Sequence, residues 1–202
     1  MNLYAATSLG IPEPRVTDDV DCIVEGAPWA SFYQLEEELR ALGFTNDMES
    51  GVICRWRFGQ LVVDMMPTEG DILGFINPLY PEGFAHAIDY QLPDRTSIRF
   101  LAPVYFLATK LVALRDRGWE DLRLSQDLED VVHLVDNRPQ LAQEVAAADE
   151  GVRRYIQQQI REVLTHPDLL EALEWTLPAG SGYERKFEIE RRLQHVAGLT
   201  SG

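Results

Sequence analysis

The chain has 202 residues, a length that suits one ample domain or a sheet-bearing domain with a helical extension. Its hydrophobic content of 46% and charged content of 25% are ordinary for a globular protein and exclude extended disorder. The formal net charge of −15 argues against a protein that binds nucleic acid through general attraction to phosphates.

The two cysteines, Cys22 and Cys54, lie in apolar, strand-like runs. They have neither the spacing of metal ligands nor that of a disulfide framework, so we expect buried thiols of a reducing compartment. No stretch is long and apolar enough to cross a bilayer. Residues 1–15 lack the basic start and apolar core of a secretory signal. These features predict a cytoplasmic protein without a membrane contact.

The first part of the chain predicts a small sheet. Residues 1–9 have the pattern of a helix that ends at Gly10. Residues 19–25 alternate as a strand does. A helix follows, with apolar residues at helical spacing and a glycine at the C-terminal cap: Phe32, Leu35, Leu39, Leu42 and Gly43. The runs 51–58 and 61–66 flank Gly59-Gln60 and predict a hairpin.

The rest of the chain predicts a loop-rich section and then helices. Residues 67–93 contain spaced glycines, prolines and aromatics, which indicate an ordered loop with one short helix. The run "SIRFLAP" predicts a short strand. Helices are expected at about 103–117, 125–136, 138–147, 149–165, 167–176 and 183–198. Ser125 is a good N-terminal cap. The predicted fold class is α+β, with a sheet domain over 1–102 and a helical domain over 103–202.

Three aspartates in the run "RVTDDVDCIVEG" lie beside apolar residues. Alternation along a strand sends Asp19 and Asp21 to the same face. Two carboxylates so close repel unless a cation lies between them, and a divalent metal with oxygen ligands satisfies that need. The alternative is a solvated acidic turn that leads into a buried strand.

Asp64 is the single charge in the apolar run "QLVVDMMP". A carboxylate buried in a strand needs a hydrogen bond, an ion pair or a metal. If strand 61–66 lies beside strand 19–25, Asp64 reaches the same edge as Asp19 and Asp21. Three such carboxylates can hold two Mg²⁺ ions roughly 4 Å apart, as in displacement at phosphorus. Alternatively, Asp64 caps the strand end or pairs with Arg55 or Arg57 across the hairpin.

The helical half carries a third feature. Lys110 lies in a helix whose other residues face a core, and an ammonium group on a flexible stem suits phosphate. Asp127 and Asp130 are three residues apart and share a helix face, from which either could hold that lysine or an arginine. The alternative is a surface lysine and a solvated acidic face.

In their order and spacing, these motifs resemble the minimal nucleotidyltransferases of the polymerase-β superfamily. They comprise Arg-x-Thr before Asp-x-Asp, a helix, a hairpin ending in a lone aspartate, and a helical domain that opens with "ATKLVALRDRG" followed by "SQDLED". Within this superfamily, the chain is most similar to the AbiEii/MenT-like toxins of bacterial toxin–antitoxin pairs, over about residues 1–165. The resemblance implies a small mixed β-sheet nucleotidyltransferase core followed by a C-terminal helical bundle.

The resemblance also implies roles for individual residues. Asp19 and Asp21 would bind the catalytic metals, with Asp64 as third carboxylate and base for the acceptor hydroxyl. In the helical half, Lys110 would contact the nucleotide's phosphates, and Asp127, or else Asp130, would complete the pocket. Arg15 and Thr17 would support the metal loop.

One part of the family pattern is missing. Superfamily members carry a Gly-Gly or Gly-Ser pair before the helix that precedes Asp-x-Asp, where backbone amides bind the triphosphate. Met1 falls within that helix, and Thr7-Ser8 is a poor replacement for the pair. We therefore expect a chain that starts late. If these residues are the whole protein, its first strand and phosphate turn are missing, which argues against activity.

Two functions follow as hypotheses. The first is a Mg²⁺-dependent enzyme that transfers a nucleoside monophosphate from an NTP to a hydroxyl of an RNA end, a protein or a small molecule, with an antitoxin as partner. The second is a catalytically degenerate module that binds a nucleotide or a protein. The second is favoured by the missing phosphate turn and by aromatics that we expect at the surface: Trp56, Trp119, Trp175 and Tyr80. The alternative for these aromatics is a place in the core.

Overall fold

The structure is a computed structural model that describes residues 17, 19–25, 29–68, 77–92, 94–177 and 183–199. The chain divides into two compact units. Residues 15–86 make up the first, the sheet unit, and the residues from Ala87 onward belong to the second, the helical unit. The fold is a mixed α+β one, as the sequence predicts. The expected helix over residues 1–9 lies outside the described residues.

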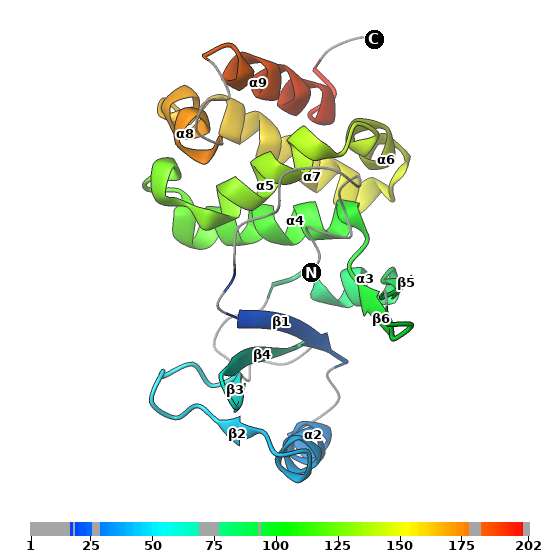
Figure 1. Ribbon diagram of the computed structural model, residues 1–202. Helices are drawn as coiled ribbons and strands as arrows, with labels where there is room; N and C mark the ends of the chain where they lie inside the picture. Colours follow the sequence, from blue (N-terminus) through cyan, green and yellow to red (C-terminus); the bar gives the residue numbers. More distant parts are fainter. Residues whose placement is uncertain are drawn as a thin grey trace. The chain divides into compact units, whose positions relative to one another are not determined.

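The sheet unit contains a four-stranded mixed sheet with strand order β1-β4-β3-β2 (Figure 1). Strand β1 runs parallel to β4, and the other neighbours are antiparallel. Its elements are β1 (Asp19–Val24), α2 (Trp29–Ala41), β2 (Thr45–Asn46), β3 (Arg55–Phe58), β4 (Leu61–Pro67) and α3 (Tyr80–Ala85). The predicted strand, helix, hairpin and short helix are confirmed. Strand β2, with two residues, is too short to leave a sequence pattern.

The hairpin between β3 and β4 fixes which residues lie opposite each other. Gly59 has a φ of +61°, which a glycine adopts without strain. The two-residue turn pairs Phe58 with Leu61, and the register then sets Arg55 against Asp64. The position of Arg55 opposite Asp64 is therefore a consequence of loop length.

The two faces of the sheet differ in character. Trp56 and Val63 are buried on one face, where Arg40 of α2 lies 5.4 Å from the Trp56 ring centroid. Helix α2 therefore packs against this face and buries Leu39. Leu42, expected on the apolar side of this helix, is 69% exposed because α2 ends at Ala41 and the chain turns away. The opposite face carries the charged residues.

The helical unit begins with a hairpin and continues with packed helices. The hairpin pairs Ile88 with Phe100, and the Tyr90 ring contacts Phe100 edge-on at 5.6 Å. Its strand β5 lies in the section predicted as loop. The elements are β5 (Ile88–Gln91), β6 (Ser97–Phe100), α4 (Pro103–Ala113), a π-helical turn (Leu114–Gly118), a 3₁₀ turn (Leu122–Leu124), α5 (Gln126–Asn137), α6 (Leu141–Ala147), α7 (Glu150–Leu164), α8 (Leu169–Thr176) and α9 (Arg185–Val196).

Helix α4 is the most completely buried helix of this unit. Leu107, Ala108 and Leu111 are each at most 1% exposed, and nearly every other residue of the helix is buried as well. A helix that is apolar on all sides is found inside a protein, whereas α7 buries one stripe only and is amphipathic. The Ser125 hydroxyl accepts a hydrogen bond from the Leu128 amide at 3.2 Å, so the predicted cap of α5 is confirmed.

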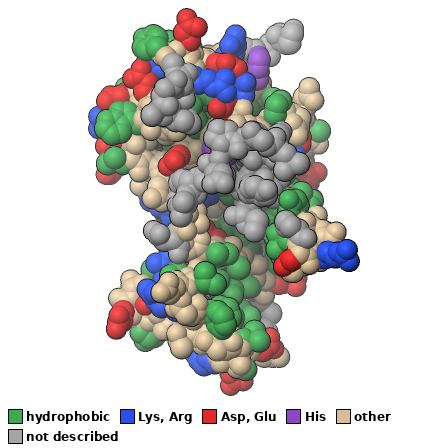
Figure 2. Space-filling view, viewed as in Figure 1, with side chains coloured by type: hydrophobic (Ala, Val, Ile, Leu, Met, Phe, Trp, Pro, Cys, Tyr) green, Lys and Arg blue, Asp and Glu red, His purple; other side chains and the backbone are tan. Residues whose placement is uncertain are grey.

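The surface of the sheet unit exposes several large apolar side chains. Figure 2 shows hydrophobic side chains gathered on the face of this unit turned to the viewer. The large apolar side chains exposed on it are Val20, Tyr33, Leu42, Met48, Ile53, Phe58 and Leu61. In the part of the chain that the structure describes, no helix has the length and apolarity to span a membrane.

The cysteines lie in the sheet unit as free thiols. Cys54 is buried, as predicted, and Cys22 is partly buried. Burial raises the pKa of both thiols, and the negative charges of Asp21 and Asp64 add to the effect at Cys22 and Cys54 respectively. Neither thiol is therefore activated as a nucleophile at neutral pH.

Candidate functional site

Strands β1 and β4 bring the predicted carboxylates to one face of the sheet. The parallel register pairs Asp21 with Asp64, so strand 61–66 lies beside strand 19–25 as expected. Paired residues of neighbouring strands point to the same face, and residues two apart on one strand do so as well. Asp19, Asp21 and Asp64 therefore project from one face of the sheet.

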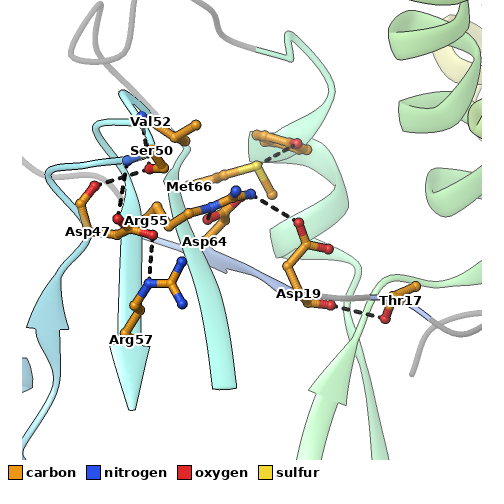
Figure 3. A network of polar contacts seen from close by, with 10 residues as sticks. Thr17, Asp19, Asp47, Ser50, Val52, Arg55, Arg57, Asp64 and Met66 are labelled. Atoms are coloured by element: carbon orange, nitrogen blue, oxygen red, sulfur yellow. Dashed lines mark hydrogen bonds and ion pairs between the residues drawn. The ribbon is translucent and has the colours of Figure 1, made fainter. Parts of the chain in front are cut away.

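Arg55 bridges two of these carboxylates from strand β3. Its Nε and Nη2 atoms donate to the two oxygens of Asp64 at 2.8 and 2.7 Å. The same Nη2 donates to Asp19 Oδ2 at 3.0 Å, so a single nitrogen lies between carboxylates of two strands (Figure 3). We call this arrangement the Arg55 bridge. The bonds to Asp64, opposed in part by burial, raise the pKa of Arg55 above its usual range.

Asp64 thus satisfies two expectations at once. It lies on the face that carries Asp19 and Asp21, and it also forms the pair with Arg55 that the alternative predicted. Asp64 is 8% exposed, and a carboxylate so buried needs such compensation. Because Arg55 also contacts Asp19, this pair lies on the same side of the sheet as the other carboxylates.

Arg57, the other arginine of β3 on this face, has a different partner. Its Nε donates to Asp47 Oδ2 at 2.8 Å, and Asp47 also accepts a bond from the Ser50 amide. Figure 3 shows this pair beside the Arg55 bridge. The alternative in which Arg57 pairs with Asp64 is therefore wrong.

Of the two residues expected to support the metal loop, the structure describes one. The Thr17 hydroxyl donates to the backbone carbonyl of Asp19 at 3.1 Å, which links it to the start of β1. Arg15 lies outside the described residues, as does Asp18.

The chemistry of the donors fits Mg²⁺, a hard cation that takes carboxylate oxygens. Asp19 and Asp64 already converge on a positively charged nitrogen, so the guanidinium of Arg55 stands in for a cation between them. In this conformation, no group of three or more acidic, histidine or cysteine residues among those described could hold a metal ion. Asp19 and Asp64 therefore offer oxygen atoms of the kind that a divalent cation takes, and in this conformation those oxygens bind Arg55.

The remaining predicted residues form a buried charge cluster in the helical unit. Lys110 Nζ lies 2.6 Å from Asp130 Oδ2 and 3.5 Å from Asp127 Oδ1. Arg117 donates to both oxygens of Asp127, at 2.8 and 2.9 Å. Asp127 and Asp130 are 3% and 2% exposed, so the alternative of a solvated acidic face is wrong.

Lys110 is held by this cluster from two sides, with 16% of its side chain exposed. The charges of Lys110, Arg117, Asp127 and Asp130 sum to zero, and the ion pairs among them partly neutralise the two buried carboxylates. Each predicted set of residues, Asp19 with Asp21 and Asp64, and Lys110 with Asp127 and Asp130, is brought together within its own unit.

Two arginines of these networks had no predicted role in a site. The two-residue hairpin turn was the signal for Arg55, because it sets residue 55 opposite residue 64. The contact of Arg55 with Asp19 had no signal, since it depends on the pairing of β1 with β4. Arg117 lies in the π-helical turn after α4, which a pattern of helical spacing does not distinguish from a regular helix.

The aromatics of the second hypothesis are divided between core and surface. Trp56 is 1% exposed and belongs to the core, while Trp175 is 68% exposed. Trp119 is partly buried, and its ring is stacked by Arg115 and met edge-on by His166. Of the tryptophans named in that hypothesis, Trp175 is the one with the exposed surface that a binding module would use.

No model of a known protein family matches this chain, and no curated protein matches it.

Proposed function

We propose that this chain is a Mg²⁺-dependent nucleotidyltransferase that transfers a nucleoside monophosphate from an NTP to a hydroxyl acceptor. The observation that carries the proposal is the parallel pairing of β1 with β4, which sets Asp21 against Asp64. Asp19 lies on the same face and shares a cationic nitrogen with Asp64. Carboxylates gathered in this way from two strands suit phosphoryl chemistry, where positioning and charge neutralisation do most of the work.

Each carboxylate has a proposed role. Asp19 and Asp21 would hold Mg²⁺, together with Asp64. When bound, Mg²⁺ would supply neutralisation of the charge on the phosphates and the leaving pyrophosphate. Asp64 would also accept the proton of the acceptor hydroxyl, a role that suits a carboxylate oriented by hydrogen bonds. Thr17 would steady the start of β1 through its bond to the Asp19 carbonyl.

The helical unit has a proposed role in nucleotide binding. Its buried cluster fixes the ammonium group of Lys110 between two carboxylates, which limits its conformations. From the resemblance to nucleotidyltransferases, we propose that Lys110 contacts the phosphates and that Asp127 and Asp130 orient it. Because Asp127 and Asp130 already pair with Lys110, the lysine would contribute direction more than attraction.

The biological setting follows from the same resemblance. We propose a toxin of a bacterial toxin–antitoxin pair, built as a nucleotidyltransferase core with a helical bundle and neutralised by an antitoxin protein. The acceptor is an RNA end, a protein side chain or a small molecule. The net charge of −15 makes a large RNA the least favourable of these on electrostatic grounds.

One observation favours the second candidate, a catalytically degenerate binding module. The Arg55 bridge neutralises part of the carboxylate face without any metal. A protein that had lost metal-dependent chemistry could keep such a bridge as a structural element. Nucleotide binding that does not depend on Mg²⁺ would distinguish this module from the enzyme.

Calorimetric titration of each of the four NTPs, with Mg²⁺ or with EDTA, tests the proposal. We expect one or more NTPs to bind in Mg²⁺ only, and binding to be lost in Asp19→Asn and in Asp64→Asn. Asp47→Asn is the matched control, because Asp47 is a buried aspartate of the same unit that pairs with an arginine of the same strand. It should leave nucleotide binding unchanged.

Transfer is then measured with labelled NTP and candidate acceptors, with pyrophosphate release as a second readout. Binding that persists in EDTA, or that Asp19→Asn and Asp64→Asn leave intact while both variants remain folded, would refute the proposed enzyme.

A further inference from the structure

Arg55 occupies the centre of the carboxylate face. Its guanidinium contacts both oxygens of Asp64 and one oxygen of Asp19, through bonds of 2.7 to 3.0 Å. Strand β4 lies between β3 and β1, so Arg55 reaches across a whole strand to meet Asp19. Figure 3 shows its side chain between the two carboxylates. An ion pair between residues of neighbouring strands does not have to cross a third strand in this way.

Arg55 is shared by two carboxylates of this face. Asp19 and Asp64 carry two negative charges, and the guanidinium between them supplies one positive charge. Arg57 lies on the same face, but it is bound to Asp47. A divalent cation would compensate the charges of both Asp19 and Asp64, whereas the guanidinium carries a single positive charge.

Arg55 and a divalent cation would use the same oxygen atoms. A Mg²⁺ ion lies about 2.1 Å from its oxygen ligands, much closer than a guanidinium nitrogen does. Because Nη2 already lies between Asp19 Oδ2 and Asp64 Oδ2, a cation shared by these oxygens would meet it directly. The Arg55 side chain is 24% exposed, so it is in contact with solvent.

We propose that Arg55 is a resident countercation of the carboxylate face, which holds Asp19 and Asp64 together in the absence of a divalent cation and competes with that cation for their oxygens. Arg55 is then a positioning residue. It holds the carboxylates of Asp19 and Asp64 close together, and it sets the concentration of divalent cation that is needed to displace its guanidinium. This inference rests on the proposed metal-dependent function and adds a means of regulating it.

The test compares the metal affinity of Arg55→Gln with that of the wild type. Mn²⁺ is the probe, and free Mn²⁺ is measured by electron paramagnetic resonance in the absence of nucleotide. Removing the competing charge should tighten Mn²⁺ binding at least about tenfold, since a unit charge close to the ligands repels the ion directly. Arg57→Gln is the matched control, two residues along the same strand and face, and should bind Mn²⁺ as the wild type does.

A merely structural role for Arg55 gives the opposite result. Loss of the bridge would then leave Asp19 and Asp64 poorly placed, and Arg55→Gln would bind Mn²⁺ as weakly as the wild type or more weakly. Either outcome overturns the inference. If Arg55→Gln does not fold, the wild type labelled with ¹⁵N-arginine decides the matter, because Mg²⁺ should shift the Arg55 Nε–H resonance. An unchanged resonance at saturating Mg²⁺ overturns the inference.

The failure of this inference is distinguishable from that of the proposed function. Tighter Mn²⁺ binding in Arg55→Gln without any NTP binding supports the countercation and refutes the nucleotidyltransferase. Metal-dependent NTP binding with unaltered Mn²⁺ affinity in Arg55→Gln refutes the countercation alone. Absence of Mn²⁺ binding in both proteins refutes both.

Discussion

Replacement of Lys110 by methionine tests the buried charge cluster of the helical unit. Methionine keeps most of the apolar stem and removes the ammonium group, which lies 2.6 Å from Asp130 and 3.5 Å from Asp127. Breaking a buried ion pair by removing one partner costs about 3 to 5 kcal/mol, because the remaining charge is left in a poor environment. Arg117 keeps its two hydrogen bonds to Asp127. The free energy of unfolding should therefore fall by about 3 kcal/mol, at the lower end of that range.

Urea unfolding followed by circular dichroism measures this loss. With a denaturant slope of about 2 kcal/mol/M, the midpoint should fall by roughly 1.5 M. The double variant Lys110→Met/Asp130→Asn should regain more than half of the lost free energy, since it removes the buried charge that the ammonium group had compensated. Arg154→Gln, which breaks an exposed pair with Glu150 on α7, is the control and should hardly shift the midpoint.

A loss below about 1 kcal/mol, which is typical of exposed ion pairs, would refute the reasoning. The reasoning would also be refuted if Asp130→Asn lowered the free energy of unfolding as much in the Lys110→Met background as it does in the wild type. The measurement also bears on function. Loss of nucleotide binding in a Lys110 variant indicates a phosphate contact only where the helical unit remains folded.

Two further predictions concern the same unit. Ser125→Ala should lower the free energy of unfolding by about 1 kcal/mol, because the Leu128 amide loses its cap, and an unchanged urea midpoint would contradict this. Burial lowers the pKa of His133, against the opposing charges of Asp130 and Asp136, and its Nε2 has no hydrogen-bond partner among the described residues. The unfolded chain then binds a proton more readily, so stability should fall as pH decreases through about 6.5, and His133→Gln should show a smaller fall in melting temperature. An equal fall in both proteins would show that other groups cause it.

The secondary structure of the described residues follows closely from local patterns. The alternation of residues 19–25 predicts β1, and the Gly59-Gln60 turn predicts the hairpin of β3 and β4. Helices α4 to α9 begin and end within a few residues of their expected bounds, because apolar spacing and caps such as Ser125 act over a single turn. The elements missed, β2 and β5, are a two-residue strand and a strand inside a glycine- and proline-rich section.

The candidate site divides in the same way between local and long-range causes. That Asp19 and Asp21 share a face, and that Arg55 lies opposite Asp64, are determined by the strand period and by loop length. These are properties of short segments, and the amino-acid sequence alone determines them.

The tertiary structure alone decided that β1 pairs with β4 in the register that sets Asp21 against Asp64. It also decided that Arg55 reaches past β4 to Asp19, and that Asp127 and Asp130 are buried around Lys110 rather than solvated. Pairing of distant strands and packing of helices depend on the burial of apolar area over the whole unit. The pattern of a short segment does not contain this information. The sequence therefore determined which charged residues are available, and packing determined which of them neutralise one another.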